Sequence, residues 1–357
     1  MRMGRAMVTI NDVSKRAGVS RSTVSRIIAD NGYVSDSARK AVEAAITELG
    51  YRPNTMARGL RSNRSDIIGA VVVDVASPFY AQMVGGMQTT CRANGKSILV
   101  GSGYALPEEE ARAIIELIDR SCDGLILYLE NPMSDAVSDI IAQSRTPVVT
   151  IGGDECKAAR ATIRIDNYSG ALFGMRHLLA NGHTDIAYLS GGLMYRDTRE
   201  RLRGIDAALA EIGMSRNDIY LEHGDFIERF GYAATKRLLG SGRRVTAIFA
   251  GDDDVAAGAL LALKHEGVVV PEEISLLGFD DNFHARHLTP ALTTVRQPVD
   301  TAGMLAVNLL LKIFAGEPLE LTDITIPTEL IVRDSVADRS GKTAAGKTAA
   351  GVEKALG

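Results

Sequence analysis

Hydrophobic and polar residues follow two different periods along this chain of 357 residues. Between residues 9 and 49 the apolar positions recur every three to four residues, which predicts short amphipathic helices. From residue 66 onward, runs of β-branched residues alternate with longer segments of helical period. Alternating strands and helices imply parallel sheets joined by right-handed crossovers. The predicted fold class is therefore α/β, preceded by an all-α region at the amino end.

Residues 9–28 (TINDVSKRAGVSRSTVSRII) predict two short helices joined by a tight turn. Thr9 can cap the first helix, with Asp12 three residues further on in a position like that of a capping box. Gly18 supplies the turn, and Ser20 can cap the second helix. Two short capped helices at this spacing indicate a helix–turn–helix.

The second of these helices buries one apolar face and presents arginines and hydroxyls on the other. Arg21 and Arg26 can each donate two hydrogen bonds to a guanine edge, and Ser22 or Ser25 can bond a base or a phosphate. We therefore expect this helix to enter a DNA major groove. Small bundles that bind no nucleic acid contain similar helix pairs, so the local pattern alone leaves that alternative open.

Two further helices are expected before residue 66. Ser35 can cap a helix whose apolar positions run to Leu49, and Gly50 ends it. The segment 51–65 (YRPNTMARGLRSNRS) places Pro53 at a helix start and combines an apolar side with the basic residues Arg58, Arg61 and Arg64. A helix this short is marginal alone in water, so we expect it to need a partner, for which DNA is one candidate.

The body of the chain has enough strands and helices for two parallel sheets. Strands are expected at 67–73, 97–101, 124–129, 147–151, 186–190, 245–250 and 274–278, and helices at 79–94, 108–120, 168–180, 200–212 and 254–266. Ligands in open α/β sheets bind beyond the carboxyl ends of the strands. Polar and aromatic residues at those ends are therefore the first candidates for a binding site.

Taken together, these motifs resemble the lactose-repressor (LacI/GalR) family of bacterial transcription regulators. The amino-terminal segment TINDVSKRAGVSRSTVSR…GYVS…ELGYRPNTMARGLRS matches without a gap, and the likeness continues through 66–72, 77–80, 182–183, 278–281 and 292–298. It covers nearly the whole chain except residues before about 8 and after about 336. The resemblance implies a periplasmic-binding-protein-like core of two α/β lobes, joined by three crossover strands, with a ligand between them.

The resemblance also implies a domain organisation. We expect a helix–turn–helix DNA-binding domain over 8–52, a hinge helix and linker over 53–65, an effector-binding and dimerisation core over 66–336, and a disordered tail over 337–357. Lobe one is expected at 66–165 plus 296–322, and lobe two at 166–292 plus 325–335.

Functional positions of the family carry over onto two sets of residues. The DNA-binding set is Thr9, Arg21, Ser22, Thr23, Ser25, Arg26, Asn54, Ala57, Leu60 and Arg61. The effector-binding set is Phe79, Tyr128, Arg201, Phe226, Asp252 and Asp280. Carboxylates and an arginine can bond the hydroxyls of a sugar, and an aromatic ring can pack on its apolar face.

The effector positions also have ordinary structural interpretations. Asp252 and Asp280 are placed to cap the next helices, Phe79 and Tyr128 to fill the core, and Arg201, at the start of its helix, to pair with a neighbouring carboxylate on a wet face.

Two positions depart from the commonest pattern of the family. Asp252 stands where asparagine is frequent, and Gly152–Gly153 stand where a ligand-facing aspartate or arginine often lies. Both departures leave the identity of the effector open.

Charge is distributed as in a nucleic-acid reader with a separate sensing domain. The net charge is −4, yet residues 1–64 contain 12 Lys and Arg against 5 Asp and Glu, which leaves the body acidic. The chain has no run of eighteen apolar residues, so no membrane span is predicted, and the amino end lacks the apolar core (h-region) of a secretory signal. Cys91, Cys122 and Cys156 make no metal-spaced pair, so we expect reduced thiols and a cytoplasmic protein. No catalytic set, metal site or cofactor is expected.

The leading prediction is a repressor that binds a pseudo-palindromic operator as a homodimer and responds to a small sugar or sugar derivative. A purine-responsive corepressor-type regulator is the alternative within regulation, because Phe79, Tyr80 and Phe226 could enclose a base. A sugar receptor without DNA function and an enzyme on the same scaffold are the alternatives outside it. The tail after Gly341 has no leucine heptad, which favours a dimer over a tetramer.

Overall fold

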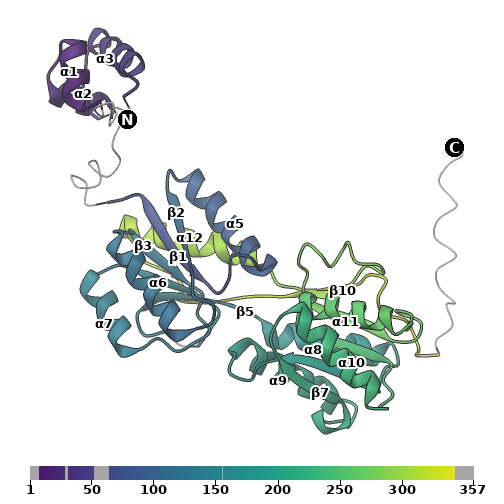
Figure 1. Ribbon diagram of the computed structural model, residues 1–357. Helices are drawn as coiled ribbons and strands as arrows, with labels where there is room; N and C mark the ends of the chain where they lie inside the picture. Colours follow the sequence, from purple (N-terminus) through teal and green to yellow (C-terminus); the bar gives the residue numbers. More distant parts are fainter. Residues whose placement is uncertain (1–7, 29–30, 52–63, 155, 342–357) are drawn as a thin grey trace, which may run out of the picture. The chain divides into compact units, whose positions relative to one another are not determined.

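The computed structural model describes residues 8–28, 31–51, 64–154 and 156–341 (Figure 1). The chain divides into two compact units, with the boundary between Ser65 and Asp66. The expected hinge helix, with Asn54, Ala57, Leu60 and Arg61, lies outside the described residues, as does the chain after Gly341.

The first unit contains α1 (Ile10–Ala17), α2 (Arg21–Ile28) and α3 (Asp36–Leu49). All three helices contribute to one small core, because each has an apolar face at helical spacing. The buried residues of that core are Val13, Val24, Ile27, Val42 and Ala45.

The expected caps and turn of this unit are confirmed. The Asp12 carboxylate accepts a hydrogen bond from the Thr9 backbone N–H at 2.8 Å. The Ser20 hydroxyl accepts one from the Thr23 N–H at 3.1 Å, which caps α2. Gly18 ends α1 with φ of 67°, a conformation that glycine adopts without steric cost. Local sequence thus fixes the angle between α1 and α2.

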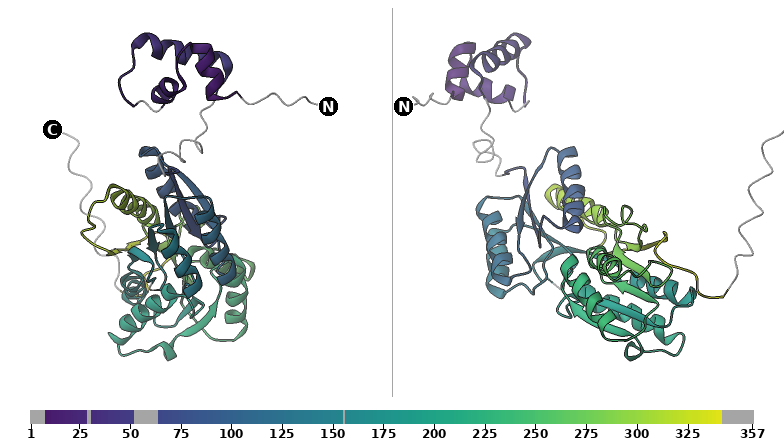
Figure 2. Two further views of the ribbon diagram at one scale, coloured as in Figure 1. Left: turned by 90° about the vertical axis from the view of Figure 1, so that its left-hand side faces the viewer. Right: turned by 45° about the vertical axis from the view of Figure 1, so that its right-hand side comes forward.

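The second unit contains two six-stranded sheets, each flanked by helices (Figures 1 and 2). Lobe one holds β1 (Ile67–Val72), α5 (Pro78–Ala93), β2 (Ser97–Ser102), α6 (Pro107–Asp119), β3 (Gly124–Leu127), α7 (Asp135–Ser144), β4 (Val148–Ile151), β5 (Ala159–Ile165), α12 (Val299–Ala315) and β11 (Asp323–Ile326). Lobe two holds α8 (Asn167–Ala180), β6 (Ile186–Gly191), α9 (Arg196–Ala210), the 3₁₀ helix η1 (Arg216–Asp218), β7 (Tyr220–Gly224), α10 (Glu228–Gly240), β8 (Ala247–Ala250), α11 (Asp253–His265), β9 (Ser275–Asp280), β10 (Thr293–Arg296) and β12 (Glu329–Ile331).

The strand order is β11-β5-β4-β3-β1-β2 in lobe one and β12-β10-β9-β8-β6-β7 in lobe two. The pairs are parallel except for β12, which runs antiparallel to β10. The chain passes between the lobes three times: after β5, after β10, and between β11 and β12. Three crossings hold the carboxyl ends of the strands of both sheets near one junction.

Helices α5 and α12 pack closely on the same lobe because two glycines permit their backbones to approach. A Cβ on Gly86 would lie 2.1 Å from the carbonyl oxygen of Asp300, and one on Gly303 would lie 2.3 Å from that of Met83. Any side chain at either glycine would force the two helices apart.

Several expected boundaries differ from the observed ones. Helix α9 begins at Arg196 rather than at residue 200, because its first turn is polar and shows no apolar period. Arg201 therefore lies inside the helix rather than at its start. The second segment of lobe two was expected from 325, yet Thr325 and Ile326 pair with β5 in lobe one. The elements that were not among those expected from the pattern are α7, α10, α12, η1, β5, β7, β10, β11 and β12.

Candidate functional site

The side chain of Arg201 is the centre of the candidate effector site. It is buried within α9, and its guanidinium lies 3.9 Å from the centroid of the Phe279 ring. Its Nε donates to the Asn167 side-chain oxygen at 2.7 Å, and Nη1 donates to the Gly251 carbonyl at 2.5 Å. These partners come from α8 and from the turn after β8, so they fix the guanidinium in one orientation. The interpretation of Arg201 as a wet surface residue is wrong.

The Asp280 carboxylate approaches the third nitrogen of Arg201 without bonding it directly. Its Oδ1 lies 4.0 Å from Nη2, which is too long for a hydrogen bond. The same oxygen accepts from the Gln297 amide at 2.5 Å, while the other amide atom of Gln297, Oε1, is buried and has no partner among the described residues. Burial raises the pKa of Asp280, and Arg201 opposes that rise.

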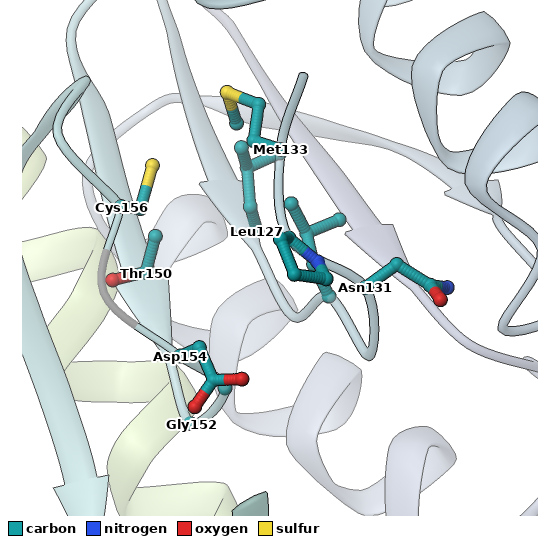
Figure 3. Close-up of a pocket in the computed structure, with 10 residues that line it drawn as sticks. Leu127, Asn131, Met133, Thr150, Gly152, Asp154 and Cys156 are labelled. Carbon is teal, nitrogen blue, oxygen red and sulfur yellow. The ribbon is translucent and has the colours of Figure 1, made fainter. Parts of the chain in front are cut away.

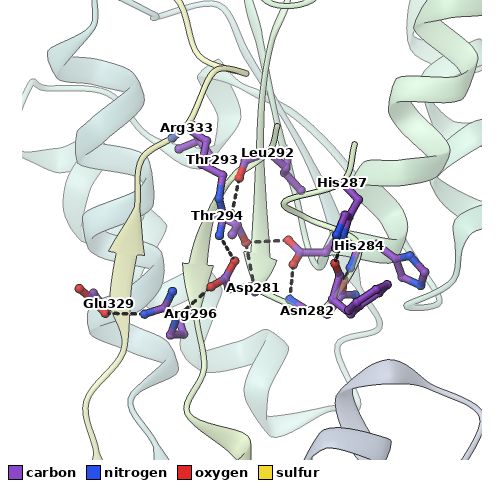
Figure 4. Close-up of polar contacts among 12 residues, drawn as sticks. Asp281, Asn282, His284, His287, Leu292, Thr293, Thr294, Arg296, Glu329 and Arg333 are labelled. Carbon is purple, nitrogen blue, oxygen red and sulfur yellow. Dashed lines mark hydrogen bonds and ion pairs between the residues drawn. The ribbon is translucent and has the colours of Figure 1, made fainter. Parts of the chain in front are cut away.

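The backbone of Asp280 is also strained. Its φ of 113° is a conformation that side chains other than glycine rarely adopt. The next residue, Asp281, is ion-paired with Arg296 at 2.8 Å and with Arg333 at 2.5 Å (Figure 4). These pairs join β10 and the segment after β12 to the turn, so the strained residue is held at a crossing between the lobes. Asp280 does not cap a helix.

Asp252 caps a helix, as its ordinary structural interpretation predicted. Its Oδ1 accepts from the Val255 N–H at 2.6 Å at the start of α11. Burial raises the pKa of Asp252, and the nearby carboxylate of Asp280 raises it further. Capping uses one oxygen of the carboxyl group, so the role leaves acceptor capacity for a ligand.

The Phe226 ring packs on the carboxyl ends of two strands of lobe two. A Cβ on Gly191 would lie 2.2 Å from this ring, and one on Gly251 would lie 3.1 Å from it. The ring is 5.4 Å from the Arg201 guanidinium and 6.0 Å from the Tyr195 ring. Glycines at the strand ends thus make the space that places Phe226 beside the arginine.

Lobe one contributes a cluster of three aromatic rings. The Phe79, Tyr80 and Tyr128 centroids lie 5.0 to 5.9 Å apart, with interplanar angles of 76° to 86°. Edge-to-face packing is a favourable geometry for aromatic pairs, so the three rings stabilise one another. Phe79 and Tyr128 are thus packed in lobe one, as their ordinary interpretation proposed, and Tyr128 also contacts lobe two.

Tyr128 explains the glycine at position 152. Gly152 has φ of 65°, and a Cβ there would lie 2.9 Å from the Tyr128 ring. The ring therefore occupies the space into which a side chain at 152 would project. The departure from the family pattern at Gly152 and the tyrosine at 128 are two parts of one packing arrangement.

Polar contacts join the two lobes beside this ring. The Tyr128 hydroxyl donates to Asp197 of α9 at 2.9 Å. Asp154 of lobe one accepts from Arg199 of α9 at 2.7 Å, and Arg196 lies 3.8 Å from the same oxygen. The first turns of α9 are thus the part of lobe two that lobe one contacts.

The sequence did not identify Glu130, which lies two residues after Tyr128. Its carboxylate accepts from the Tyr80 hydroxyl at 3.3 Å. Burial, together with the charge of Asp197, raises the pKa of Glu130 to about 8. Asn167, Asp197 and Gln297 were also missed. No motif marks these residues, because each reaches the site only through packing of the two lobes.

A small pocket lies beside this junction in lobe one (Figure 3). It is bounded by the turns after β3 and β4, including Asn131, Met133, Asp154 and Cys156. Figure 3 shows the Met133 and Cys156 sulfurs on one side and the Asp154 carboxylate on the other. No group of three His, Cys, Asp or Glu able to hold a metal ion occurs among the described residues.

The reading face of α2 contrasts with these buried groups. Arg21, Ser22 and Arg26 are exposed, and Thr23 and Ser25 are partly exposed. The hydroxyls of Ser22 and Thr23 lie 2.7 and 2.8 Å from that of Ser20. The face therefore presents two guanidinium groups and several hydroxyls to solvent, as recognition of base edges requires.

Comparison with known proteins decides the family. Residues 9–54 match the model of the bacterial regulatory proteins of the lacI family, and residues 175–336 match that of a periplasmic binding protein-like domain. The chain is 38% identical to the HTH-type transcriptional regulator GalR of Escherichia coli, over 94% of this chain and 97% of the relative. The protein belongs to the lacI family. It is a DNA-binding transcriptional regulator with an effector-binding core, and not an enzyme.

Further lacI-family relatives support the same assignment. The HTH-type transcriptional repressor PurR of Erwinia tasmaniensis is 34% identical, over 93% of this chain and 98% of the relative. The structure of the lac repressor dimer bound to operator and an anti-inducer superimposes with a TM-score of 0.83 at 28% identity, covering 93% of this chain and all of that one. The complex of the regulator CelR with cellobiose gives 0.69 at 32% identity, covering 92% and 99%. The expected fold, two lobes behind a helix–turn–helix, is confirmed.

In the part of the chain that the structure describes, none of the helices of this lacI-family protein is long and apolar enough to cross a membrane.

Proposed function

We propose that this protein is a cytoplasmic homodimeric repressor whose operator affinity is controlled by a sugar-like effector held between the two lobes. The observation that carries the proposal is the buried pair of Arg201 and Asp280, held 4.0 Å apart by other contacts. A hydroxyl can donate to the carboxylate and accept from the guanidinium at once, so a polyol fits such a gap. A relative that is 32% identical has been solved with cellobiose, which supports this choice.

The purine alternative has less support. PurR relatives reach 34% identity, so the overall likeness does not separate the two effector classes. A base needs two roughly parallel faces to stack between, whereas Phe79 and Tyr80 meet at 86° and pack on each other. The acidic groups around Arg201 suit hydroxyls better than the acceptor-rich edge of a purine.

The DNA side of the proposal rests on α2. Arg21, Ser22 and Arg26 read base edges in the major groove, and dimerisation doubles the footprint on a pseudo-palindrome. We further propose that residues 54–61, which lie outside the described residues, fold into a helix only on the operator, with Leu60 wedged into the minor groove. Leu60→Ala should weaken operator binding far more than binding to random DNA, and equal losses on both would rule out the wedge.

The effector proposal is tested by thermal shift of the full chain against sugars, nucleosides and purines. A sugar that raises the melting temperature should also change operator affinity, because binding favours one arrangement of the lobes. We expect release, which is the commoner outcome among members of the family. Calorimetry with the same sugar on Asp280→Asn should show that binding is lost. A purine that binds while every sugar fails would overturn the proposal.

A further inference from the structure

Carboxyl groups outnumber cations at the junction between the lobes. Asp252, Asp280 and Asp197 of lobe two and Glu130 of lobe one all act electrostatically on their neighbours there. Arg201 is the buried cation among them, and it is already engaged with Asn167, Gly251 and two aromatic rings. Even with Arg196 and Arg199, which pair with Asp154 at the same junction, acidic groups outnumber basic ones around a bound effector.

Two of these carboxyl groups, Glu130 and Asp197, lie on opposite lobes. Each accepts a hydrogen bond from a tyrosine hydroxyl of lobe one: Glu130 from Tyr80 at 3.3 Å and Asp197 from Tyr128 at 2.9 Å. The two tyrosine rings pack edge to face with centroids 5.1 Å apart, which brings the two carboxyl groups near each other. The two lobes thus bring two carboxyl groups together, whereas a site of balanced charge would pair a carboxyl group with a cation.

From these contacts we propose that Glu130 and Asp197 are specificity residues that restrict the effector to uncharged polyols. Each has oxygen atoms able to accept from effector hydroxyls, and together they repel a phosphate or a carboxylate on the effector. The inference rests on the proposed sugar-controlled function and adds the charge class of the ligand. It separates unphosphorylated sugars from sugar phosphates and sugar acids.

The physical basis is the burial of like charges. At about 4 Å and the effective dielectric of a protein surface, two unit charges interact by several times the thermal energy. Above the pKa of Glu130, which is about 8, an anionic group would meet that repulsion from both carboxyl groups, and below it from the Asp197 charge, whereas a hydroxyl can hydrogen-bond to either group. Arg201 offsets only part of this repulsion, because Asp280 lies 4.0 Å from it and two of its nitrogens already donate to Asn167 and Gly251.

The same negative surroundings should appear without any ligand as a pH dependence of stability. The groups facing Glu130 are Tyr80, Glu110, Tyr128, Tyr195, Asp197 and Arg201. Because the pKa of Glu130 is raised to about 8 in the folded state, folding retains a proton that the unfolded chain releases. Stability should therefore fall as the pH rises from about 4.5 to 8, the window between the two pKa values.

The first arm of the test uses the ligand-free full chain. Melting temperatures are measured from pH 5.5 to 8.5 for the wild type, Glu130→Gln and Glu116→Gln, the last removing an exposed carboxylate from α6. The wild type and the control should lose stability across this range, and Glu130→Gln should lose clearly less. The same slope in all three proteins would overturn the proposal.

The second arm uses matched sugars at pH 8.5, above the pKa of Glu130 of about 8, so that the Glu130 carboxyl group is charged. D-galactose, D-glucose and D-ribose are compared with D-galacturonate, glucose 6-phosphate and ribose 5-phosphate by thermal shift and calorimetry. We expect binding among the uncharged compounds only, and a gain of roughly tenfold or more for the matching anion in Glu130→Gln combined with Asp197→Asn. An anion that binds the wild type as tightly as its uncharged counterpart would overturn the charge rule.

The two arms separate the two proposals. If Glu130→Gln flattens the pH slope and none of the sugars binds, the negative surroundings stand and the sugar proposal fails. If a sugar binds but the pH slopes are identical, the sugar proposal stands and the roles of Glu130 and Asp197 fail.

Discussion

The DNA-reading helix and the effector site of this protein are built in opposite ways. The side chains of α2 that are proposed to read DNA come from five residues within the stretch 21–26, lie exposed or partly exposed, and depend on their neighbours only for a cap and a small core. Those of the effector site come from both lobes, and Arg201, Asp252 and Tyr128 are buried. A change in the reading helix should therefore alter function alone, whereas a change in the effector site should alter function and stability together.

Arg201→Ala should have the largest effect and would test that contrast most strongly. Removing the guanidinium leaves Asp280 and the Asn167 oxygen buried without their partner, which costs about 3–5 kcal/mol of unfolding free energy. Denaturant unfolding measures the loss, and calorimetry should show that effector binding disappears. Arg203→Ala is the control, because its exposed pair with Glu200 contributes about 0–1 kcal/mol. Equal stability of the two variants would contradict the buried role.

Arg21→Ala should affect DNA binding without affecting folding. The side chain is exposed on α2, so its loss should leave the unfolding free energy within about 0.5 kcal/mol of the wild type. Operator binding should weaken by roughly 1–3 kcal/mol, with relaxed preference at one base pair in each half-site. Lys15→Ala removes one exposed charge from α1 and is the control. If Arg21→Ala bound operator and random DNA with unchanged affinities, Arg21 would not be a base-reading residue.

The same contrast explains how much the sequence could predict. Caps, turn and reading face of α2 follow from residues within one local pattern, so Thr9, Gly18 and Ser20 lie where they were expected. Glu130 and Asp197 could not be found that way, because they meet only after the chain has crossed between the lobes.

Arg201 shows an intermediate case. Family resemblance predicted its position in the site, yet its place in the second turn of α9 was hidden by a polar first turn without an apolar period. Asp252 likewise proved to cap α11, and its pKa is raised first by burial and then by the neighbouring carboxylate of Asp280. Resemblance identifies such positions, whereas their protonation and partners depend on tertiary contacts.

Gly152→Ala should reduce the unfolding free energy moderately, and the reduction measures how tightly the Tyr128 ring packs against residue 152. The substitution strains a backbone with φ of 65° and places a methyl group 2.9 Å from the Tyr128 ring. Gly242→Ala is a matched control, because its φ is 73° and nothing lies within 4 Å of its Cβ position. Backbone strain alone costs roughly 1–2 kcal/mol at either site, so Gly152→Ala should lose measurably more stability. Equal losses would mean that the ring moves aside freely.

Tyr128→Phe should have the smallest effect, and it measures the contact between the lobes. The variant keeps the ring that packs on Phe79, Tyr80 and Gly152 but loses the hydroxyl that donates to Asp197. One such hydrogen bond contributes about 1 kcal/mol, although the Asp197 oxygen left behind can be solvated because that residue is only partly buried. A double-mutant cycle with Asp197→Asn separates the pair from its surroundings. If the hydroxyl joins the lobes, the two changes should be non-additive in unfolding free energy by several tenths of a kcal/mol. Binding of the variants to random DNA should be unaltered, because both substitutions lie outside the helix–turn–helix. Strict additivity would show that lobe two is held by the Asp154–Arg199 pair and the crossover strands alone, and the effector site would then have one fewer contact linking its two halves.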